Sequence, residues 1–152
     1  MQVHSLTARL TDLTTGLVRG LKLLERNELA CCGVPMSQSM VLQSLASARE
    51  PQRMSQIADV LGVAQSTATR FVDPLVEQGK VVRQPAADDG RAVVIRLTPK
   101  GSTLAKELMA GSMRCSEGIL EKISPEKQQE VIEAVEIVVE AISDCCAECC
   151  ER

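Results

Sequence analysis

Leucines recur at helical spacing in the first part of the chain. The intervals are four, three, four, four and three residues along Leu6, Leu10, Leu13, Leu17, Leu21 and Leu24. Such spacing places these side chains on one face of an α-helix. The pattern predicts a long amphipathic helix that ends near Gly33-Val34-Pro35.

A second helical pattern follows from about Met36 and stops before the polar segment 48–51. We expect four of its apolar positions to face inward, namely Met40, Val41, Leu42 and Leu45. A short helix over 54–61 comes next and is closed by Gly62, which adopts left-handed backbone easily. Another helix opens at residues 63–66 and runs to about Gln78. A short helix, a tight glycine turn and a second helix form the helix-turn-helix layout.

After Gly79 the pattern changes from helical to extended. β-branched residues cluster within 81–84 and 91–97, and the dipeptide Asp89-Gly90 lies between these runs. Such an arrangement predicts a β-hairpin. Thr98-Pro99 and Ser124-Pro125 then each supply a cap and a proline suited to a first helical position. The last of the two helices that follow has an apolar face of Val131, Ile132, Val135, Val138, Val139 and Ile142. The expected fold is mainly α, with about six helices and a small β-hairpin.

Composition indicates where in the cell the protein is expected and in which state its cysteines are expected. Phe71 is the only aromatic residue, so the core is aliphatic. No run of 18 apolar residues occurs, and residues 1–9 lack the pattern of a secretory signal. We expect a cytoplasmic protein without a membrane partner. Thiols stay reduced there, so seven cysteines suggest metal or redox chemistry rather than structural disulfides.

Charge is divided unevenly along the chain, whose net charge is −3. Residues 49–100 hold eight Lys and Arg against six Asp and Glu, and the remainder holds nine against fourteen. A basic middle between acidic arms is compatible with phosphate contact by the middle alone. An ordinary solvated surface explains the same excess equally well.

The second helix of a helix-turn-helix lies in the major groove of DNA, where its first two turns meet bases and phosphates. Glutamine suits adenine, arginine suits guanine, and hydroxyls suit bases or phosphates. The small Ala64 and Ala68 are expected to allow close approach to the groove. A capped, solvated helix face is the alternative interpretation. The candidate DNA-binding residues on this helix are Gln65, Ser66, Thr67, Thr69 and Arg70.

The hairpin adds two more candidates at its tip. An arginine at the position of Arg91 suits the narrow minor groove, because the negative potential there attracts it. Asp89 suits a forked ion pair with that guanidinium. Taken alone, the sequence Asp-Gly-Arg is explained as well by a simple turn.

These features together resemble the MarR family of winged helix-turn-helix regulators. The matching segments are IADVLGV at 57–63, STATRFVD at 66–73, LVEQG at 75–79, VR at 82–83, DGRA at 89–92 and LTPKG at 97–101. The resemblance implies a homodimer with intertwined first, fifth and sixth helices. It implies that two lobes bind a pseudo-palindromic operator in double-stranded DNA, which a ligand or an oxidation signal releases. Residues 36–101 would form the DNA-binding domain, and residues 1–35 and 102–152 the dimerisation region.

Three positions depart from the family pattern. Pro74 lies inside the recognition helix, where it removes a backbone donor and is expected to kink the helix. Gly90 stands where many members have a second arginine, so that the minor-groove contact would depend on Arg91. Lys80 replaces a usual apolar residue, with a small expected effect. Pro74 lies beyond the base-reading turns, so we expect DNA binding to survive.

Six cysteines occur in pairs and are candidate metal ligands. Cys145-Cys146 and Cys149-Cys150 repeat at a spacing of four, and Cys31-Cys32 ends the first helix. In the dimer that the resemblance implies, the two groups could converge. Thiolates bind soft ions such as Zn(II), Cu(I) and Hg(II), metalloids, or iron–sulfur clusters. A disulfide switch and inert packing are the alternatives, and inert packing is preferred for Cys115.

Catalysis has little support in this sequence. His4 is the only histidine, and no glycine-rich phosphate loop precedes a helix. The expected function is a transcription regulator, and a repressor in particular. Its expected partners are double-stranded DNA, a second copy of the chain and a metal, metalloid or oxidant effector. The rival hypothesis is a thiol-rich metal-binding dimer that kept the fold without operator recognition.

Overall fold

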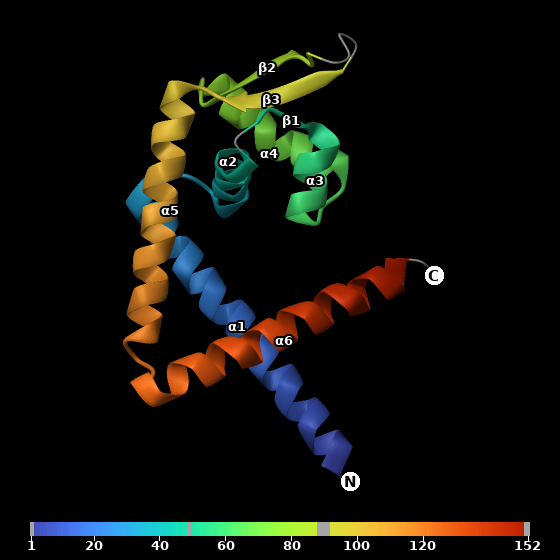
Figure 1. The fold of residues 1–152 in the computed structure, drawn as a ribbon, viewed down its shortest axis with the longest axis vertical. Coiled ribbons are helices and arrows are strands. Elements are labelled where there is room, and N and C mark those ends of the chain that lie inside the picture. The colour runs from blue at the N-terminus through green and yellow to red at the C-terminus, as the bar shows by residue number, and fades with distance from the viewer. Residues whose placement is uncertain (1, 49, 88–91, 151–152) are drawn as a thin grey trace. The chain divides into compact units, whose positions relative to one another are not determined.

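Figure 1 shows a computed structural model of the chain, which describes residues 2–48, 50–87 and 92–150. Within these residues the chain forms six α-helices and three short strands. Their bounds are α1 Gln2–Cys32, α2 Met36–Ala48, β1 Gln52–Arg53, α3 Met54–Leu61, α4 Gln65–Glu77, β2 Val81–Pro85, β3 Val93–Leu97, α5 Pro99–Leu120 and α6 Pro125–Cys150. The predicted mainly helical fold with a winged helix-turn-helix is confirmed.

The chain divides into two compact units, which are described separately. The first unit covers residues 1–111 and contains α1 to α4, the three strands and the first half of α5. The second unit covers residues 112–152 and contains the end of α5 and α6. No helix among the described residues is long and apolar enough to cross a membrane.

The core of the first unit lies among α2, α3, α4 and the sheet. Its fully buried side chains include Val41, Leu42, Ile57, Val72, Leu75, Val81 and Ile95. The prediction that Met40 faces inward is wrong, because its side chain is 43% exposed. Val41, Leu42 and Leu45 occupy the buried face of α2, and at about 100° per residue position 40 falls on the opposite side.

The turn between α3 and α4 has the predicted glycine geometry. Gly62 has a φ of 63°, in the left-handed region that favours glycine. The amide of Gly62 donates to the carbonyl of Asp59 at 3.1 Å, and the amide of Val63 donates to that of Ala58 at 3.0 Å. These bonds satisfy carbonyls at the end of α3 and turn the chain into α4.

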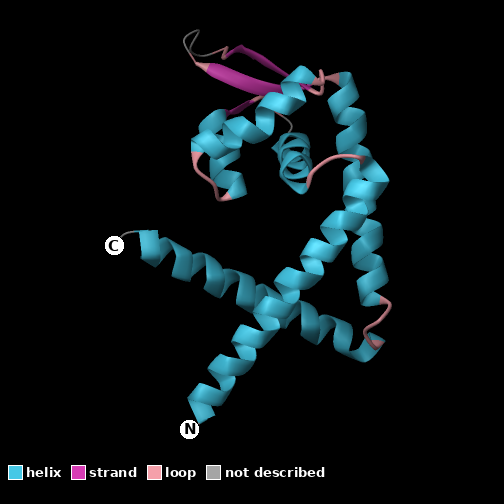
Figure 2. Cartoon of the chain, turned by 180° about the vertical axis from the view of Figure 1, so that it is seen from behind, coloured by secondary structure: helices cyan, strands magenta, loops and turns pink. Residues whose placement is uncertain are grey.

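The three strands form one antiparallel sheet in the order β1-β3-β2 (Figure 2). Val81 pairs with Leu97 at one end of the hairpin and Pro85 with Val93 at the other, which confirms the predicted strand pair. The turn at Asp89-Gly90 lies outside the described residues. The sequence pattern missed β1, because its two residues, Gln52 and Arg53, are too few to show alternation.

Hydrogen bonds join the start of α5 to the segment that follows α4. The amide of Gly101 donates to Thr98 Oγ1 at 3.1 Å, which confirms Thr98 as the cap. The Thr98 hydroxyl donates to the carbonyl of Gly79 at 2.8 Å, and the Thr98 amide donates to that of Lys80 at 3.0 Å. A Cβ atom on Gly101 would lie 1.9 Å from the Lys80 carbonyl oxygen. Only glycine permits this close approach.

Candidate nucleic-acid interface

Helix α4 has a buried face and an outward face. Ala68, Val72 and Leu75, spaced four and three residues apart, are fully buried in the core. Gln65 and Arg70 lie outside this stripe and are exposed. The expectation that Ala68 allows close approach to DNA is wrong, because the core covers it. The outward side of the first two turns therefore presents polar and cationic groups.

The remaining candidates on α4 differ in exposure. Ser66 is exposed, whereas Thr67 and Thr69 are half-buried. The Thr69 hydroxyl donates to the carbonyl of Gln65 at 2.9 Å. That bond uses the hydroxyl proton and leaves its oxygen able to accept. The five predicted positions therefore all lie in the first two turns of α4, and Gln65, Ser66 and Arg70 are the most accessible of them.

Helix α4 is continuous through Pro74. It extends from Gln65 to Glu77 with the proline inside it. The amide of Gln78 donates to the carbonyl of Pro74 at 3.0 Å, so the last turn closes after the proline. Pro74 cannot donate to the carbonyl of Arg70, which loses its usual helical partner. The proline lies nine positions after Gln65, beyond the exposed turns.

An ion pair joins α4 to the wing strand β2. The guanidinium of Arg83 donates to the Asp73 carboxylate, and the two side chains are 40% and 47% exposed. Sequence reasoning missed this pair, because a separation of ten residues across a turn leaves no periodic signal. It links the helix that carries the candidate base-reading residues to the strand that leads to the wing tip.

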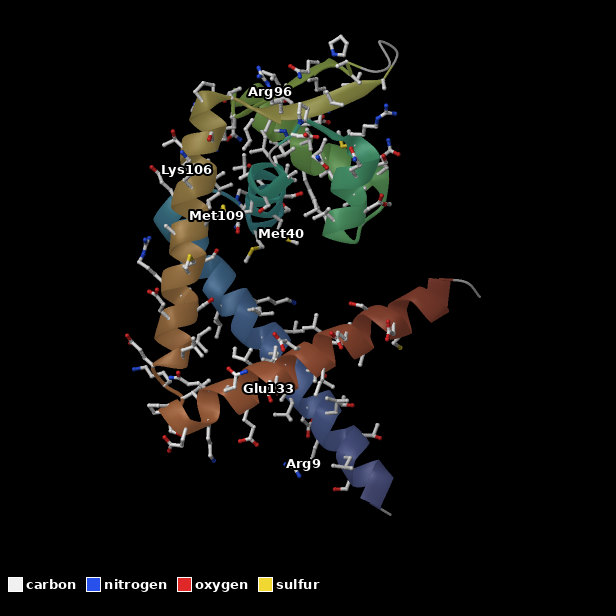
Figure 3. All side chains as sticks on the ribbon, in the orientation of Figure 1. Arg9, Met40, Arg96, Lys106, Met109 and Glu133 are labelled. Atoms are coloured by element: carbon white, nitrogen blue, oxygen red, sulfur yellow. The ribbon has the colours of Figure 1, made fainter. Side chains whose placement is uncertain are left out.

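The two wing-tip candidates are not placed. Asp89 and Arg91 lie outside the described residues, and their predicted roles stay predictions. The described part of the wing carries further cations, because Arg83 on β2 and Arg96 on β3 are both exposed. Figure 3 shows the Arg96 side chain on β3.

Lys80 follows α4 at the junction with α5. Burial lowers the pKa of Lys80 below its ordinary value, and the neighbouring Lys100 ammonium lowers it further. The Lys100 ammonium donates to the carbonyl of Gln78 at 3.2 Å. Both lysines therefore lie at the end of α4 opposite the start that carries the candidate base-reading residues.

The cysteine candidates are described only in part. The side chains of Cys31, Cys32, Cys146, Cys149 and Cys150 lie outside the described ones, whereas Cys145 is exposed and Cys115 is half-buried. Among the described side chains no cluster of three or more potential metal ligands occurs. Helix α6 extends through Cys150, so helical register applies to the whole run. At spacings of four, three and four, the positions Val138, Ile142, Cys145 and Cys149 share one face of α6.

Comparisons with known proteins agree with this geometry. The model of the MarR family matches residues 34–93. The solved structure of the transcriptional regulator PA3341 is 25% identical with a TM-score of 0.72, over 89% of this chain and 98% of that one. The S. aureus MepR–DNA complex is 16% identical with a TM-score of 0.75, over 87% and 96% of the two chains. The reduced form of MarR from E. coli is 22% identical with a TM-score of 0.70, over 88% and 95%.

The match covers the helix-turn-helix, β2 and the first residue of β3, so it includes the five candidates on α4 and Arg83 but not Arg96. The fold likeness extends beyond it, over nearly nine-tenths of the chain in each of the three structures. Residues 34–93 therefore form a MarR family domain.

Proposed function

We propose that the chain represses transcription by binding a pseudo-palindromic operator in duplex DNA as a homodimer. The observation that carries this proposal is the outward face of α4. Burial of Ala68, Val72 and Leu75 fixes the rotation of the helix and leaves Gln65, Ser66 and Arg70 accessible. The MepR structure of the same fold is a complex with DNA, which supports the proposal.

Each outward side chain has a role in this proposal. Arg70 makes a bidentate contact with a guanine, and Gln65 makes one with an adenine. Ser66, Thr67 and Thr69 bind phosphates or base edges through their hydroxyl oxygens. The wing adds Arg91 in the neighbouring minor groove, oriented by Asp89.

Exposed apolar faces support the dimer. Along α1 the side chains of Leu6, Leu10, Leu13, Leu17 and Leu21 are 51–63% exposed in the single chain. Along α6, Ile132, Val135, Val139 and Ile142 are 43–57% exposed. Apolar stripes of this length in water favour association, at about 25 cal/mol for each Å² removed from solvent. We propose that a second copy covers both faces.

The dimer links the cysteines to DNA binding. The Cys145 and Cys149 positions continue the apolar face of α6, which would lie at the dimer interface. Thiolates there bind a soft metal or metalloid ion, or form a disulfide on oxidation. Either event releases the operator if it favours a dimer whose two recognition helices do not match the half-sites.

The experiment uses purified reduced protein and labelled duplex from the region upstream of its own gene. We expect tight binding that competitor DNA of scrambled sequence does not remove. The logarithm of the binding constant should fall steeply with the logarithm of the salt concentration, because phosphate contacts release counterions. Sedimentation should give twice the mass of one chain. Equal affinity for the scrambled duplex would contradict operator recognition and favour the thiol-rich metal-binding dimer.

A further inference from the structure

The turn between α5 and α6 lies within the second unit, where the chain changes direction sharply (Figure 1). The elbow, as we name it, consists of residues 120–128. None of the described side chains of the second unit, which extend to Cys145, is fully buried. Leu120, Ile123 and Gln128 are half-buried and lie in the elbow. With so little buried apolar surface, packing within one chain holds the direction of α6 only weakly.

The Gln128 side chain ties the two sides of the elbow together with two hydrogen bonds. Its Nε2 donates to the carbonyl of Leu120 at 3.0 Å and to the carbonyl of Ile123 at 3.3 Å. An amide nitrogen has two protons, so it can serve both acceptors. These carbonyls lie at and just after the end of α5, where helical partners run out. Among the described residues, no other side-chain hydrogen bond crosses the elbow.

The next residue along the chain makes a different kind of contact. Gln129 is exposed, and its Nε2 donates to Glu133 Oε1 at 2.9 Å. Both partners of that bond lie on α6, so it does not cross the elbow. Two adjacent glutamines therefore differ in one respect: only Gln128 joins α6 to the end of α5.

The elbow lies on the path of the chain between the recognition helix and the proposed dimer face. Helix α5 is continuous from the junction with α4 to the elbow. Helix α6 then carries the exposed apolar face to which the proposed function assigns a second copy, formed by Ile132, Val135, Val139 and Ile142. In a dimer held by that face, a new direction of α6 at the elbow would displace one recognition helix relative to its mate.

We propose that Gln128 is a positioning residue, which sets the direction of α6 and thereby the half-site spacing that the dimer accepts. One base pair inserted between half-sites moves one of them by about 3.4 Å and rotates it by about 34°. A dimer with a fixed elbow rejects this change, whereas a dimer with a loose elbow follows it. The inference rests on the proposed function, because half-site spacing has meaning only for a dimer that binds an operator.

Operators with one base pair inserted or deleted between the half-sites test the proposal with the full chain. Wild type should lose at least about fivefold in affinity, because a rigid dimer must deform the altered DNA. Gln128→Leu keeps the bulk of the side chain but removes both donors, and it should lose less than about twofold. Its affinity for the natural spacing should fall severalfold, because the elbow must be ordered on binding. The matched control Gln129→Leu should behave like wild type.

Two further variants separate donation from shape. The ammonium of Gln128→Lys can donate to the same carbonyls and complements the dipole at the end of α5. It should therefore keep the spacing preference of wild type. The carboxylate of Gln128→Glu has no donor at neutral pH, so this variant should resemble Gln128→Leu. A purely structural role would instead make the spacing preference follow the free energy of unfolding in urea, whatever donor is present.

Hydrogen exchange of the chain without DNA tests the contact itself. The Ile123 amide donates to the Leu120 carbonyl at 2.9 Å. It should exchange at least about threefold faster in Gln128→Leu than in Gln129→Leu. Equal exchange in these two variants, or equal spacing preference, would overturn the proposal. Absence of operator binding by wild type would contradict the proposed function and with it the role in spacing, whereas the exchange rates would still show whether Gln128 holds the elbow.

Discussion

The guanidinium of Arg83 on β2 binds the carboxylate of Asp73 on α4. The pair connects the wing strand to the recognition helix at the surface of the first unit. Exposed ion pairs contribute only about 0–1 kcal/mol to folding. We therefore expect the pair to act mainly on the position of the wing relative to α4 during DNA binding, rather than on folding.

Asp73→Asn is expected to lower DNA affinity while it leaves the free energy of unfolding nearly unchanged. The free energy of unfolding in urea should change by less than about 1 kcal/mol, because the pair is exposed. Operator affinity should fall severalfold, because the wing must be ordered during binding. The exposed control Glu117→Gln should alter neither quantity. Unchanged operator affinity in Asp73→Asn would show that the pair does not position the wing.

Gly101→Ala is expected to destabilise the fold by about 2–4 kcal/mol, since overpacking against backbone cannot be relieved by a rotamer change. The added methyl group would lie 1.9 Å from the Lys80 carbonyl oxygen. The matched control is Gly118→Ala on the same helix, where a Cβ meets nothing within 4 Å. That control should gain about 0.5–1 kcal/mol of stability. Urea unfolding curves compare the two, and a similar midpoint for both would contradict the close approach.

Lys80 predicts a pH dependence of stability. Burial, and then the Lys100 ammonium, lower its pKa in the folded chain below the ordinary value of 10.5. Between the lowered pKa and 10.5 the unfolded chain holds more protons, so the contribution of Lys80 to stability rises with pH. At pH values below that window Lys80 is charged in the folded chain as well, and the free-energy cost of keeping its charge in these surroundings is then present in full.

Lys80→Met removes this penalty. The variant should be more stable than wild type at neutral pH, and its advantage should shrink as the pH approaches 10.5. Urea unfolding of both proteins from pH 7 to 10.5 measures the difference. An advantage that stays constant or grows across this range would argue against a lowered pKa of Lys80.

The C-terminal cysteines predict a thiol-dependent loss of DNA binding. Arsenite, Cu(I), Hg(II) or the oxidant diamide should reduce the operator affinity of wild type at least tenfold. Replacement of Cys145, Cys146, Cys149 and Cys150 by serine should abolish the response and leave affinity in reducing buffer intact. The control Cys115→Ser should respond like wild type. Retention of the response by the quadruple variant would exclude this cluster as the sensor.

Local chemistry explains why most of the fold could be predicted from the sequence. Gly62 with its positive φ and Thr98 as a cap fix element ends through their own backbone and hydroxyl. Met40 and Ala68 were misassigned, because both lie in helices whose rotation is set by packing against other elements. β1 and the Asp73–Arg83 pair depend on segments distant in sequence, so no local pattern reveals them.

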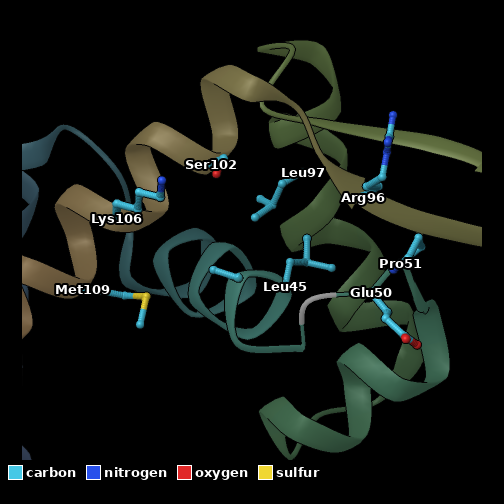
Figure 4. A pocket seen from close by; sticks show the side chains of 9 residues that line it. Leu45, Glu50, Pro51, Arg96, Leu97, Ser102, Lys106 and Met109 are labelled. Atoms are coloured by element: carbon cyan, nitrogen blue, oxygen red, sulfur yellow. The ribbon is translucent and has the colours of Figure 1, made fainter.

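The candidate site was predictable only in outline. Helix-turn-helix geometry predicted Gln65 and Arg70 in the first two turns of the recognition helix, and the structure leaves both exposed. Residue types alone do not reveal that Thr69 bonds back to the Gln65 carbonyl. A pocket of about 410 Å³ at Lys106 (Figure 4) was also unforeseen, because it joins α2, β3 and α5, which lie far apart along the chain.

The central claim is that the outward start of α4 reads base edges, and Arg70→Ala tests it most directly. Fluorescence anisotropy should show operator affinity at least about fivefold below that of wild type, since a bidentate arginine–guanine contact contributes about 1–3 kcal/mol of discrimination. The control Arg114→Ala, exposed outside the MarR family match, should retain wild-type affinity. Equal affinity of the two variants for the operator would contradict the account.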